Sequence, residues 1–229
     1  MLRVTAISVA LLLPWLAHAQ SADIPPPPTV LDDGSTEVAE LIVLARGPGR
    51  DPSAATTECL WAHLPPDQQR ALTATADHAV RTLTHHDDLP LKNPALTDAA
   101  VTVALQACGG SDAPKAIPFA RTALLAFAAE NATARPLARD RIPTPRLERG
   151  WAALTRRQQE VLLEASVLDD DEISDELGEE LAPALFKALR LVRPAGAWNP
   201  LGYRNGTTTH RVIYYYQAYS VRTAMERRF

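Results

Sequence analysis

The pair of cysteines constrains the fold of this chain most, because Cys59 and Cys108 are the only two in 229 residues. Each lies near the end of a predicted helix, and the segments between them read as a helical hairpin. A disulfide between them would close a loop of about 50 residues and contribute about 4 kcal/mol through loop-closure entropy. We therefore predict a Cys59–Cys108 disulfide, with two buried free thiols as the alternative. The spacing is not that of a C-x-x-C redox pair, and we predict no zinc site at these cysteines.

The N-terminus has the three parts of a secretory signal peptide. Residues 1–19 contain Arg3, an apolar run from Val4 to Ala17, and the small-x-small end Ala17-His18-Ala19. The run of about 14 residues is shorter than the roughly 20 that span a bilayer as a helix. We expect cleavage near residue 20 and a periplasmic or secreted protein, with an uncleaved anchor as the alternative. Disulfides persist in such compartments. We expect no transmembrane segment after cleavage.

Proline and arginine mark the expected domain boundaries. Residues 20–35 include four consecutive prolines, which favour an extended tether without a packed core. We predict an N-terminal helical unit over 36–135, which contains the disulfide. A segment rich in arginine and proline then leads to a C-terminal helical unit over 144–229, which forms a second domain or packs with the first.

Apolar residues recur at helical spacing along the mature chain, and its ten glycines are few beside its alanines and leucines. We predict an all-α fold, an irregular bundle of about eight or nine helices. Caps and prolines suggest the boundaries. The predicted helices are 36–46, a helix from Asp51-Pro52 through Cys59, one from Pro66 to about 84, one from Asn93-Pro94 to Cys108, 116–133 ending before Pro136, one from Thr144-Pro145 through Leu154, one opened by a Thr155–Gln158 capping box, 181–192, and 207–229.

The C-terminal segment gives conflicting signals. The run Val212-Ile213-Tyr214-Tyr215-Tyr216 has the residue types that favour a strand. Val212, Tyr215 and Tyr219 nevertheless share one helical face, and no partner strand is evident elsewhere. We therefore predict a helix.

Aromatic and basic side chains near this helix form a candidate binding surface for a ligand or partner. Core packing of a terminal helix is the alternative for the same residues. The candidate surface consists of Trp198, Tyr203, Tyr215, Tyr219 and Arg211.

A group of histidines and one aspartate is a candidate metal site. His63, His85, His86 and Asp87 resemble the ligand set of the all-helical metal-dependent phosphohydrolases, which use a histidine, an adjacent His-Asp pair and a distant aspartate. The resemblance implies a divalent metal that activates water for hydrolysis. Asp88-Leu89-Pro90 departs from the family pattern, and a helix ending in a polar loop would contain the same residues. A metal-dependent hydrolase is therefore the alternative function.

A second short motif indicates a binding role. Leu154-Thr155-Arg156-Arg157-Gln158 resembles the Leu-Thr-x-x-Gln motif of small helical periplasmic stress chaperones, and residues 64–68 form a degenerate second copy. Those proteins are exported and bind unfolded clients on an apolar face. The resemblance implies an unfolded client or another envelope protein as partner. The capping box alone also accounts for these residues.

Charge and the missing motifs exclude other classes. The chain has 23 basic and 27 acidic residues, which argues against nucleic acid as a partner. Neither a Gly-x-Ser-x-Gly nucleophile elbow nor a glycine-rich phosphate loop occurs, and no catalytic triad is legible. We therefore expect no cofactor and favour a non-catalytic binding or envelope-stress role over an enzyme.

Overall fold

The computed structural model describes residues 35–45, 55–83, 89–110, 114–166, 181–189 and 206–229. Every regular element in these ranges is a helix, so the predicted all-α fold class is confirmed. None of the helices described is both long and apolar enough to cross a membrane. The predicted signal peptide and all but the last residue of the predicted tether lie outside the described ranges.

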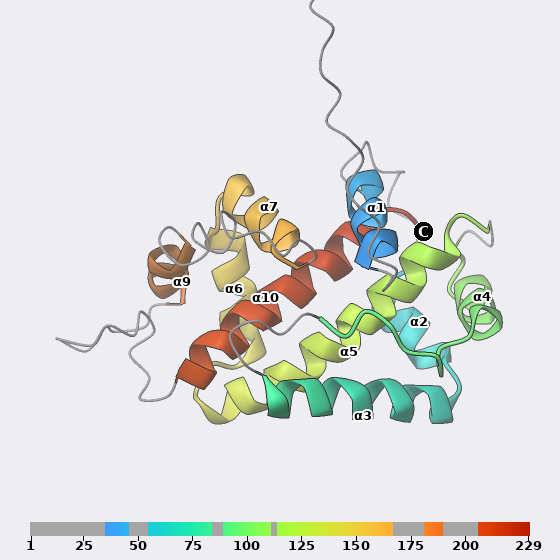
Figure 1. The fold of residues 1–229 in the computed structure, drawn as a ribbon, viewed down its shortest axis with the longest axis horizontal. Helices are drawn as coiled ribbons and strands as arrows, with labels where there is room; N and C mark the ends of the chain where they lie inside the picture. The colour runs from blue at the N-terminus through green and yellow to red at the C-terminus, as the bar shows by residue number, and fades with distance from the viewer. Residues whose placement is uncertain (1–34, 46–54, 84–88, 111–113, 167–180, 190–205) are drawn as a thin grey trace, which may run out of the picture. The chain divides into compact units, whose positions relative to one another are not determined.

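Two long helices form the centre of the fold. α5 (Ile117–Arg139) and α10 (Gly206–Glu226) make the most extensive helix–helix contact, and α10 packs along α5 (Figure 1). Half of the buried residues on α5 are alanines, whereas α10 presents tyrosines, valines and a methionine. Small side chains on one helix leave room for large ones on the other, as close packing requires.

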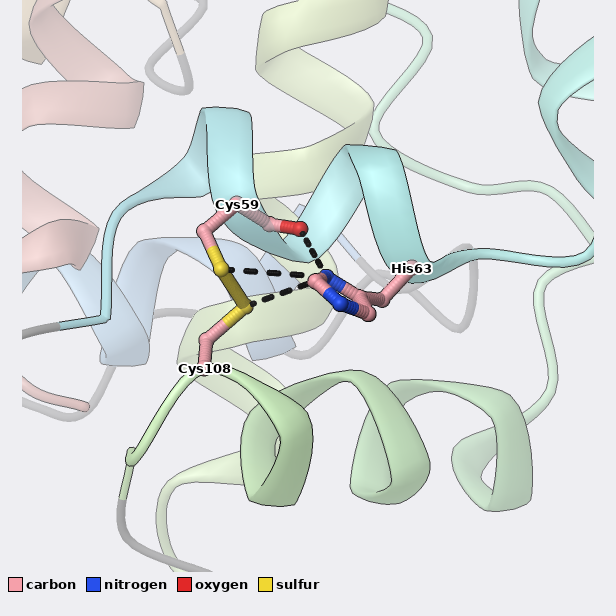
Figure 2. A group of neighbouring side chains, drawn as sticks. All are labelled: Cys59, His63 and Cys108. Atoms are coloured by element: carbon pink, nitrogen blue, oxygen red, sulfur yellow. Dashed lines mark hydrogen bonds between the residues drawn. A yellow bond between two sulfur atoms is a disulfide. The ribbon is translucent and has the colours of Figure 1, made fainter.

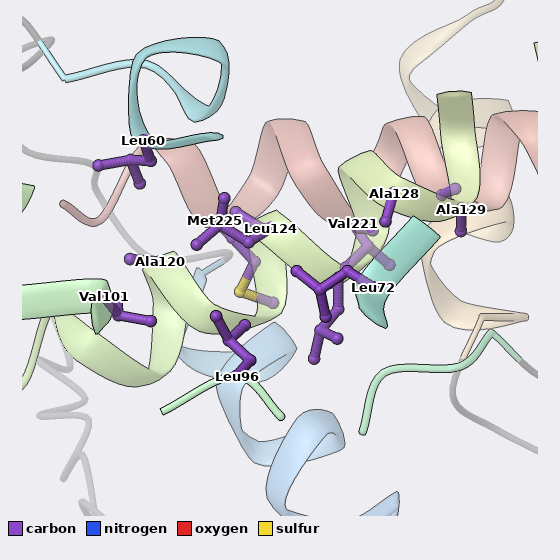
Figure 3. Close-up of a cluster of buried hydrophobic side chains, with 14 of the residues drawn as sticks. Leu60, Leu72, Leu96, Val101, Ala120, Leu124, Ala128, Ala129, Val221 and Met225 are labelled. Atoms are coloured by element: carbon purple, nitrogen blue, oxygen red, sulfur yellow. The ribbon is translucent and has the colours of Figure 1, made fainter. Parts of the chain in front are cut away.

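The remaining N-terminal helices surround α5. They are α1 (Ser35–Ala45), α2 (Thr57–His63), α3 (Pro66–Thr82) and α4 (Asp98–Ala107). α2, α3 and α4 all pack against α5, whereas α1 contacts mainly α10. Their apolar faces meet those of α5 and α10 in the larger of two hydrophobic clusters (Figure 3), which includes Leu60, Leu72, Leu96, Val101, Leu124, Val221 and Met225.

A second cluster lies under α6 (Thr144–Ala153), α7 (Arg156–Glu164) and α9 (Ala182–Ala188). Adjacent tyrosines of α10 divide between the clusters: Tyr214 belongs to the first, and Tyr215 and Tyr216 to the second. The predicted helix at the C-terminus is therefore correct. A helix can point three successive tyrosines in different directions, so tertiary burial on several sides overrides their strand propensity.

Two predicted helix starts are wrong. α2 begins at Thr57, because Thr56 is extended and its hydroxyl accepts a hydrogen bond from the Cys59 N–H. The predicted Asp51-Pro52 cap therefore does not belong to this helix, and both residues lie outside the described ranges. α4 begins after Thr97, which caps the Ala100 N–H.

The expected cap of α4, Asn93, has a different role. Its carboxamide oxygen accepts the Ala95 N–H, and its NH₂ group donates to Thr75 Oγ1 on α3 at 2.8 Å. Asn93 thus forms a turn and ties that turn to α3. The turn brings Leu96 into the core before the helix starts.

The predicted end of α5 before Pro136 is also wrong, since the helix continues to Arg139. A proline inside a helix costs about 3 kcal/mol, because it lacks an N–H and its ring crowds the preceding turn. Beyond it, however, Leu137 and Ile142 are fully buried, and burial of each side chain contributes about 1.5–3 kcal/mol. The gain from burial offsets the cost of the proline.

Candidate functional site

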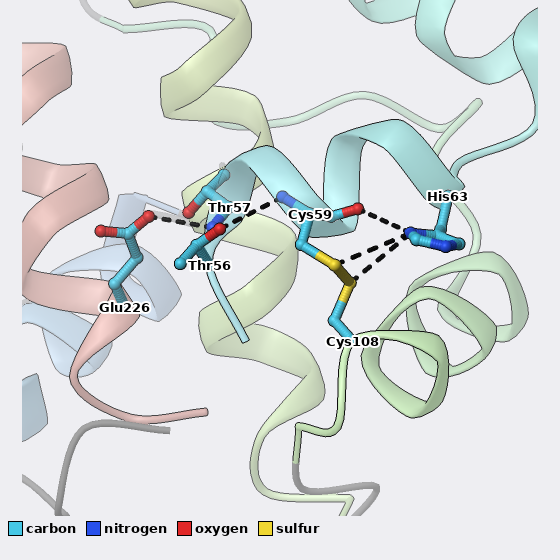
Figure 4. The surroundings of a disulfide bond; sticks show 6 residues. All are labelled: Thr56, Thr57, Cys59, His63, Cys108 and Glu226. Atoms are coloured by element: carbon cyan, nitrogen blue, oxygen red, sulfur yellow. Dashed lines mark hydrogen bonds between the residues drawn. A yellow bond between two sulfur atoms is a disulfide. The ribbon is translucent and has the colours of Figure 1, made fainter. Parts of the chain in front are cut away.

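The predicted disulfide is present. Cys59, in the first half of α2, is bonded to Cys108, the residue that ends α4 (Figure 4). The chain turns away after Cys108 through Gly109, whose φ of +70° lies in the left-handed region that favours glycine. The bond therefore joins two short helices that both pack against α5 and against each other.

His63 lies over the disulfide, one helical turn beyond Cys59 on α2. Its Nδ1 is 2.9 Å from the Cys59 carbonyl oxygen, 3.7 Å from Cys59 Sγ and 3.6 Å from Cys108 Sγ (Figure 2). The Cys-x-x-x-His spacing of Cys59 and His63 is visible in the sequence and predicts one helical face. The predicted metal site grouped His63 instead with His85, His86 and Asp87.

Cysteine and histidine are residue types that can bind a metal ion. Among the described residues, the ligand atoms of Cys59, His63 and Cys108 lie close together. Zinc and other soft metals bind cysteine as thiolate, and a disulfide has no thiolate to offer. The oxidised protein therefore has no metal site here. The other predicted metal ligands, His85, His86 and Asp87, lie outside the described residues, so the predicted hydrolase site stays a prediction.

Arg222 on α10 is the centre of a second polar cluster. Its Nε donates to Glu130 Oε2 on α5 at 2.7 Å, and its Nη1 lies 3.2 Å from Glu226 and 3.4 Å from Glu58. Tyr215 donates its hydroxyl to the same Glu130 carboxylate at 3.3 Å. One guanidinium thus joins α2, α5 and α10.

Burial and the neighbouring charges shift the pKa values of Glu130 and Arg222 in opposite directions. Burial raises the pKa of Glu130, and the charge of Arg222 acts against that rise. Burial tends to lower the pKa of Arg222, but the charge and hydrogen bond of Glu130, together with the charges of Glu226 and Glu58, raise this pKa overall. Perturbed ionisable groups mark catalytic sites, but structural ion pairs show the same shifts. Each group here has a partner within the protein, which indicates a structural role.

The structure describes three of the five residues of the predicted aromatic surface. Tyr215 is only 1% exposed and lies in the core. Tyr219 and Arg211 are half-buried: Tyr219 packs on Trp151 with ring centroids 5.0 Å apart, and Arg211 lies 3.9 Å from Asp140. The other two residues of that surface, Trp198 and Tyr203, lie outside the described ranges.

A groove lies between α1, residues 91–94 and the start of α5. Its volume is about 340 Å³. Apolar side chains form much of it, and Lys92 and Arg121 supply positive charge. The lining residues are Val38, Leu41, Leu91, Lys92, Asn93, Pro94, Pro118, Arg121 and Thr122.

The surface of α1 next to this groove is apolar as well. Leu41, Ile42 and Ala45 are buried, but Val43 is 66% exposed and Leu44 58% exposed. A helix that packs on one side usually presents polar residues on the other, and the end of α1 does not. Exposed apolar residues that adjoin a groove are typical of interaction surfaces.

The motif at residues 154–158 has a complete local explanation. Thr155 Oγ1 accepts the Gln158 N–H, and Gln158 Oε1 accepts the Thr155 N–H, so the predicted capping box is confirmed. Leu154 is buried and belongs to the second hydrophobic cluster.

Comparison of the whole chain with protein-family models, with curated proteins and with solved structures finds no match.

Proposed function

We propose that this protein is a non-catalytic binding protein of the periplasm or the secreted space, and that its client is an unfolded envelope protein. The client contributes an extended apolar segment, which lies on the exposed face of α1 and enters the groove beside it. The observation that carries this proposal is the exposure of Val43 and Leu44 on a helix whose other face lines that groove.

A polypeptide segment fits this surface better than a compact small molecule. Leu44 follows Leu41 by one turn, so the exposed residue adjoins the groove along the helix. A chain can cover both features at once, whereas a ligand confined to about 340 Å³ would leave Leu44 in water. Arg121 is paired with Asp98, so the exposed Lys92 is the lining residue that complements an acidic residue in such a segment.

The expected compartment supports the same role. The leader-like residues 1–19 indicate export, and a disulfide between helices is stable in an oxidising space. Proteins that unfold there are accessible to a binding protein that needs no nucleotide. The polar clusters around Arg222 and at the capping box are saturated by internal partners, which agrees with a role other than catalysis.

The test is suppression of aggregation of an unfolded envelope protein by an equimolar amount of the purified chain. We expect the wild-type chain to suppress light scattering, and Leu44→Ser to weaken this effect several-fold. Val103→Ser is the matched control, because Val103 is also a helical apolar residue and is 60% exposed, but lies on α4.

Lys92→Glu provides a second arm of the same test. Lys92→Glu should weaken the suppression of aggregation for a client that has an acidic residue beside its apolar segment. For a client without such a residue, suppression should be unchanged. If the wild-type chain does not suppress aggregation at all, or if Leu44→Ser and Val103→Ser have equal effects, the proposed function is wrong.

A further inference from the structure

The two sulfurs of the disulfide differ in access. Cys59 is half-buried, Cys108 is buried, and the His63 side chain that covers them is exposed. An external thiol can therefore approach Cys59 more readily than Cys108. In thiol–disulfide exchange a thiolate attacks one of the two sulfurs, so that sulfur must be accessible.

The imidazole of His63 is placed to act on either sulfur once the bond opens. Its Nδ1 lies 3.6 Å from Cys108 Sγ and 3.7 Å from Cys59 Sγ. The contact of the same nitrogen with the Cys59 carbonyl, at 2.9 Å, holds the ring in this position. A neighbouring histidinium stabilises a thiolate, which makes that sulfur a better leaving group.

We propose that Cys59–Cys108 is an exchangeable disulfide, which an external dithiol attacks at Cys59 while His63 assists the departure of the Cys108 sulfur. The Cys59–Cys108 disulfide in the structure and the contacts of His63 carry this proposal, which does not depend on the proposed client-binding role.

The chemistry balances with one dithiol. Its thiolate forms a bond to Cys59 Sγ, the Cys59–Cys108 bond breaks, and the electron pair leaves on Cys108 Sγ, which takes a proton from histidinium 63. The second thiolate of the dithiol then attacks the other sulfur of the same dithiol, which is bonded to Cys59 in the mixed disulfide. This attack releases Cys59 as a thiolate, which is protonated from solvent. The dithiol is oxidised to a disulfide, and both cysteines are reduced.

Opening the bond changes the connection of α2 to α4 and leaves its connection to α10. The Thr57 N–H donates to Glu226 on α10 at 3.0 Å, and Glu58 lies 3.4 Å from Arg222. The exchange therefore removes the covalent link between α2 and α4 and leaves α2 attached to α10. It would serve as a redox switch at this edge of the protein.

Mapping the mixed disulfide tests the direction of attack. The full chain is exposed to reduced glutathione, quenched in acid and digested, and the glutathionylated peptide is identified by mass spectrometry. We expect glutathione on Cys59. Modification mainly of Cys108, or equal modification of both, would overturn the assignment.

The rate of reduction by dithiothreitol tests the role of His63. We expect His63→Gln to slow reduction by about threefold or more, because the leaving thiolate loses a neighbouring cation. The same variant should shift the glutathione equilibrium towards the disulfide. His78→Gln is the control, since His78 is exposed on α3 and contacts neither sulfur.

The sign of the effect separates the proposal from a purely structural role. If His63 only held α2 in place, its replacement would loosen the helix and speed reduction. An unchanged or faster rate in His63→Gln, with His78→Gln equal to wild type, would therefore contradict the proposal.

Discussion

Arg222 donates its Nε–H to Glu130 Oε2 at 2.7 Å, and the two side chains are only 10% and 11% exposed. The residues lie 92 positions apart and join α10 to α5. Arg222 also stacks over the Tyr219 ring, with its guanidinium carbon 4.8 Å from the centroid. Removing one partner would leave the other charge buried without compensation.

We predict that Arg222→Met lowers the free energy of unfolding by about 3–5 kcal/mol, the usual effect of breaking a buried ion pair. The double variant Arg222→Met/Glu130→Leu should recover part of this loss, because it also removes Glu130, the most buried of the three carboxylates that pair with Arg222. Urea denaturation measures both variants. The surface pair Arg121–Asp98 gives the control, and Arg121→Met should cost less than about 1 kcal/mol. Equal losses in the two single variants would show that burial of the Arg222 pair does not matter.

The buried tyrosines predict an alkaline limit of stability. Burial is the main cause that raises the pKa of both Tyr215 and Tyr216 above the ordinary value near 10. A raised pKa in the folded state means that the unfolded state loses protons first. The contribution of these two tyrosines to the free energy of unfolding is therefore complete below about pH 10. It is lost as the pH rises towards their pKa values in the folded state.

Unfolding measured against pH tests this prediction. Above about pH 10 the free energy of unfolding should fall by up to about 1.4 kcal/mol per pH unit for each of the two tyrosines. Tyr216→Phe should remove one share of that slope, even though it also loses the hydrogen bond to the Leu147 carbonyl. A slope unchanged by Tyr216→Phe would mean that Tyr216 ionises in the folded protein.

Arg141 has a backbone conformation that suits glycine. Its φ is +65°, and it follows the C-terminal end of α5, where a left-handed residue closes the helix. The left-handed conformation costs an ordinary residue roughly 1–2 kcal/mol. We expect Arg141→Gly to raise the free energy of unfolding by about 1 kcal/mol, because this cost exceeds the extra entropy of glycine in the unfolded chain. Arg139→Gly, at the last residue of the helix, should lower it, by up to about 1 kcal/mol. Opposite signs in thermal denaturation would support this account.

Gly150 on α6 permits the close approach of α10. A Cβ at this position would lie 2.2 Å from Tyr216 Oη and 2.8 Å from Leu189 Cδ2. We predict that Gly150→Ala destabilises the protein by about 1–3 kcal/mol, the range for an overpacked core. Gly150→Ala/Tyr216→Phe should show a favourable coupling energy, because the phenylalanine removes the atom that clashes. Additive effects of the two changes in calorimetry would contradict this contact.

Local signals in the sequence predicted a good part of the fold. The capping box at Thr155 and Gln158 is correct because its hydrogen bonds join residues three apart, and the neighbouring sequence suffices to form them. The helix containing Tyr215 is correct because apolar spacing extends over several turns. The predicted start of α4 at Asn93 is wrong, because Asn93 instead forms a turn that is tied to Thr75 of another helix, a contact that the neighbouring sequence does not show.

The candidate sites show the same division. The Cys59–Cys108 bond was predictable because the chain has one pair of cysteines. The spacing of Cys59 and His63 was also present in the sequence, but it could not show that Cys108 brings its sulfur to the same imidazole. The pairing of Arg222 with Glu130 had no local signal, because many arginines and glutamates could have paired over that separation.

The sequence by itself determined that the chain is helical, where most helices lie and which cysteines join, because these follow from spacing, capping and a single possible pairing. Only the tertiary structure decided that α5 passes through Pro136, that Tyr215 is buried beside Glu130 and that Leu44 stays exposed. Those outcomes depend on how much apolar surface each residue buries against distant helices, and that quantity exists only after the chain has packed.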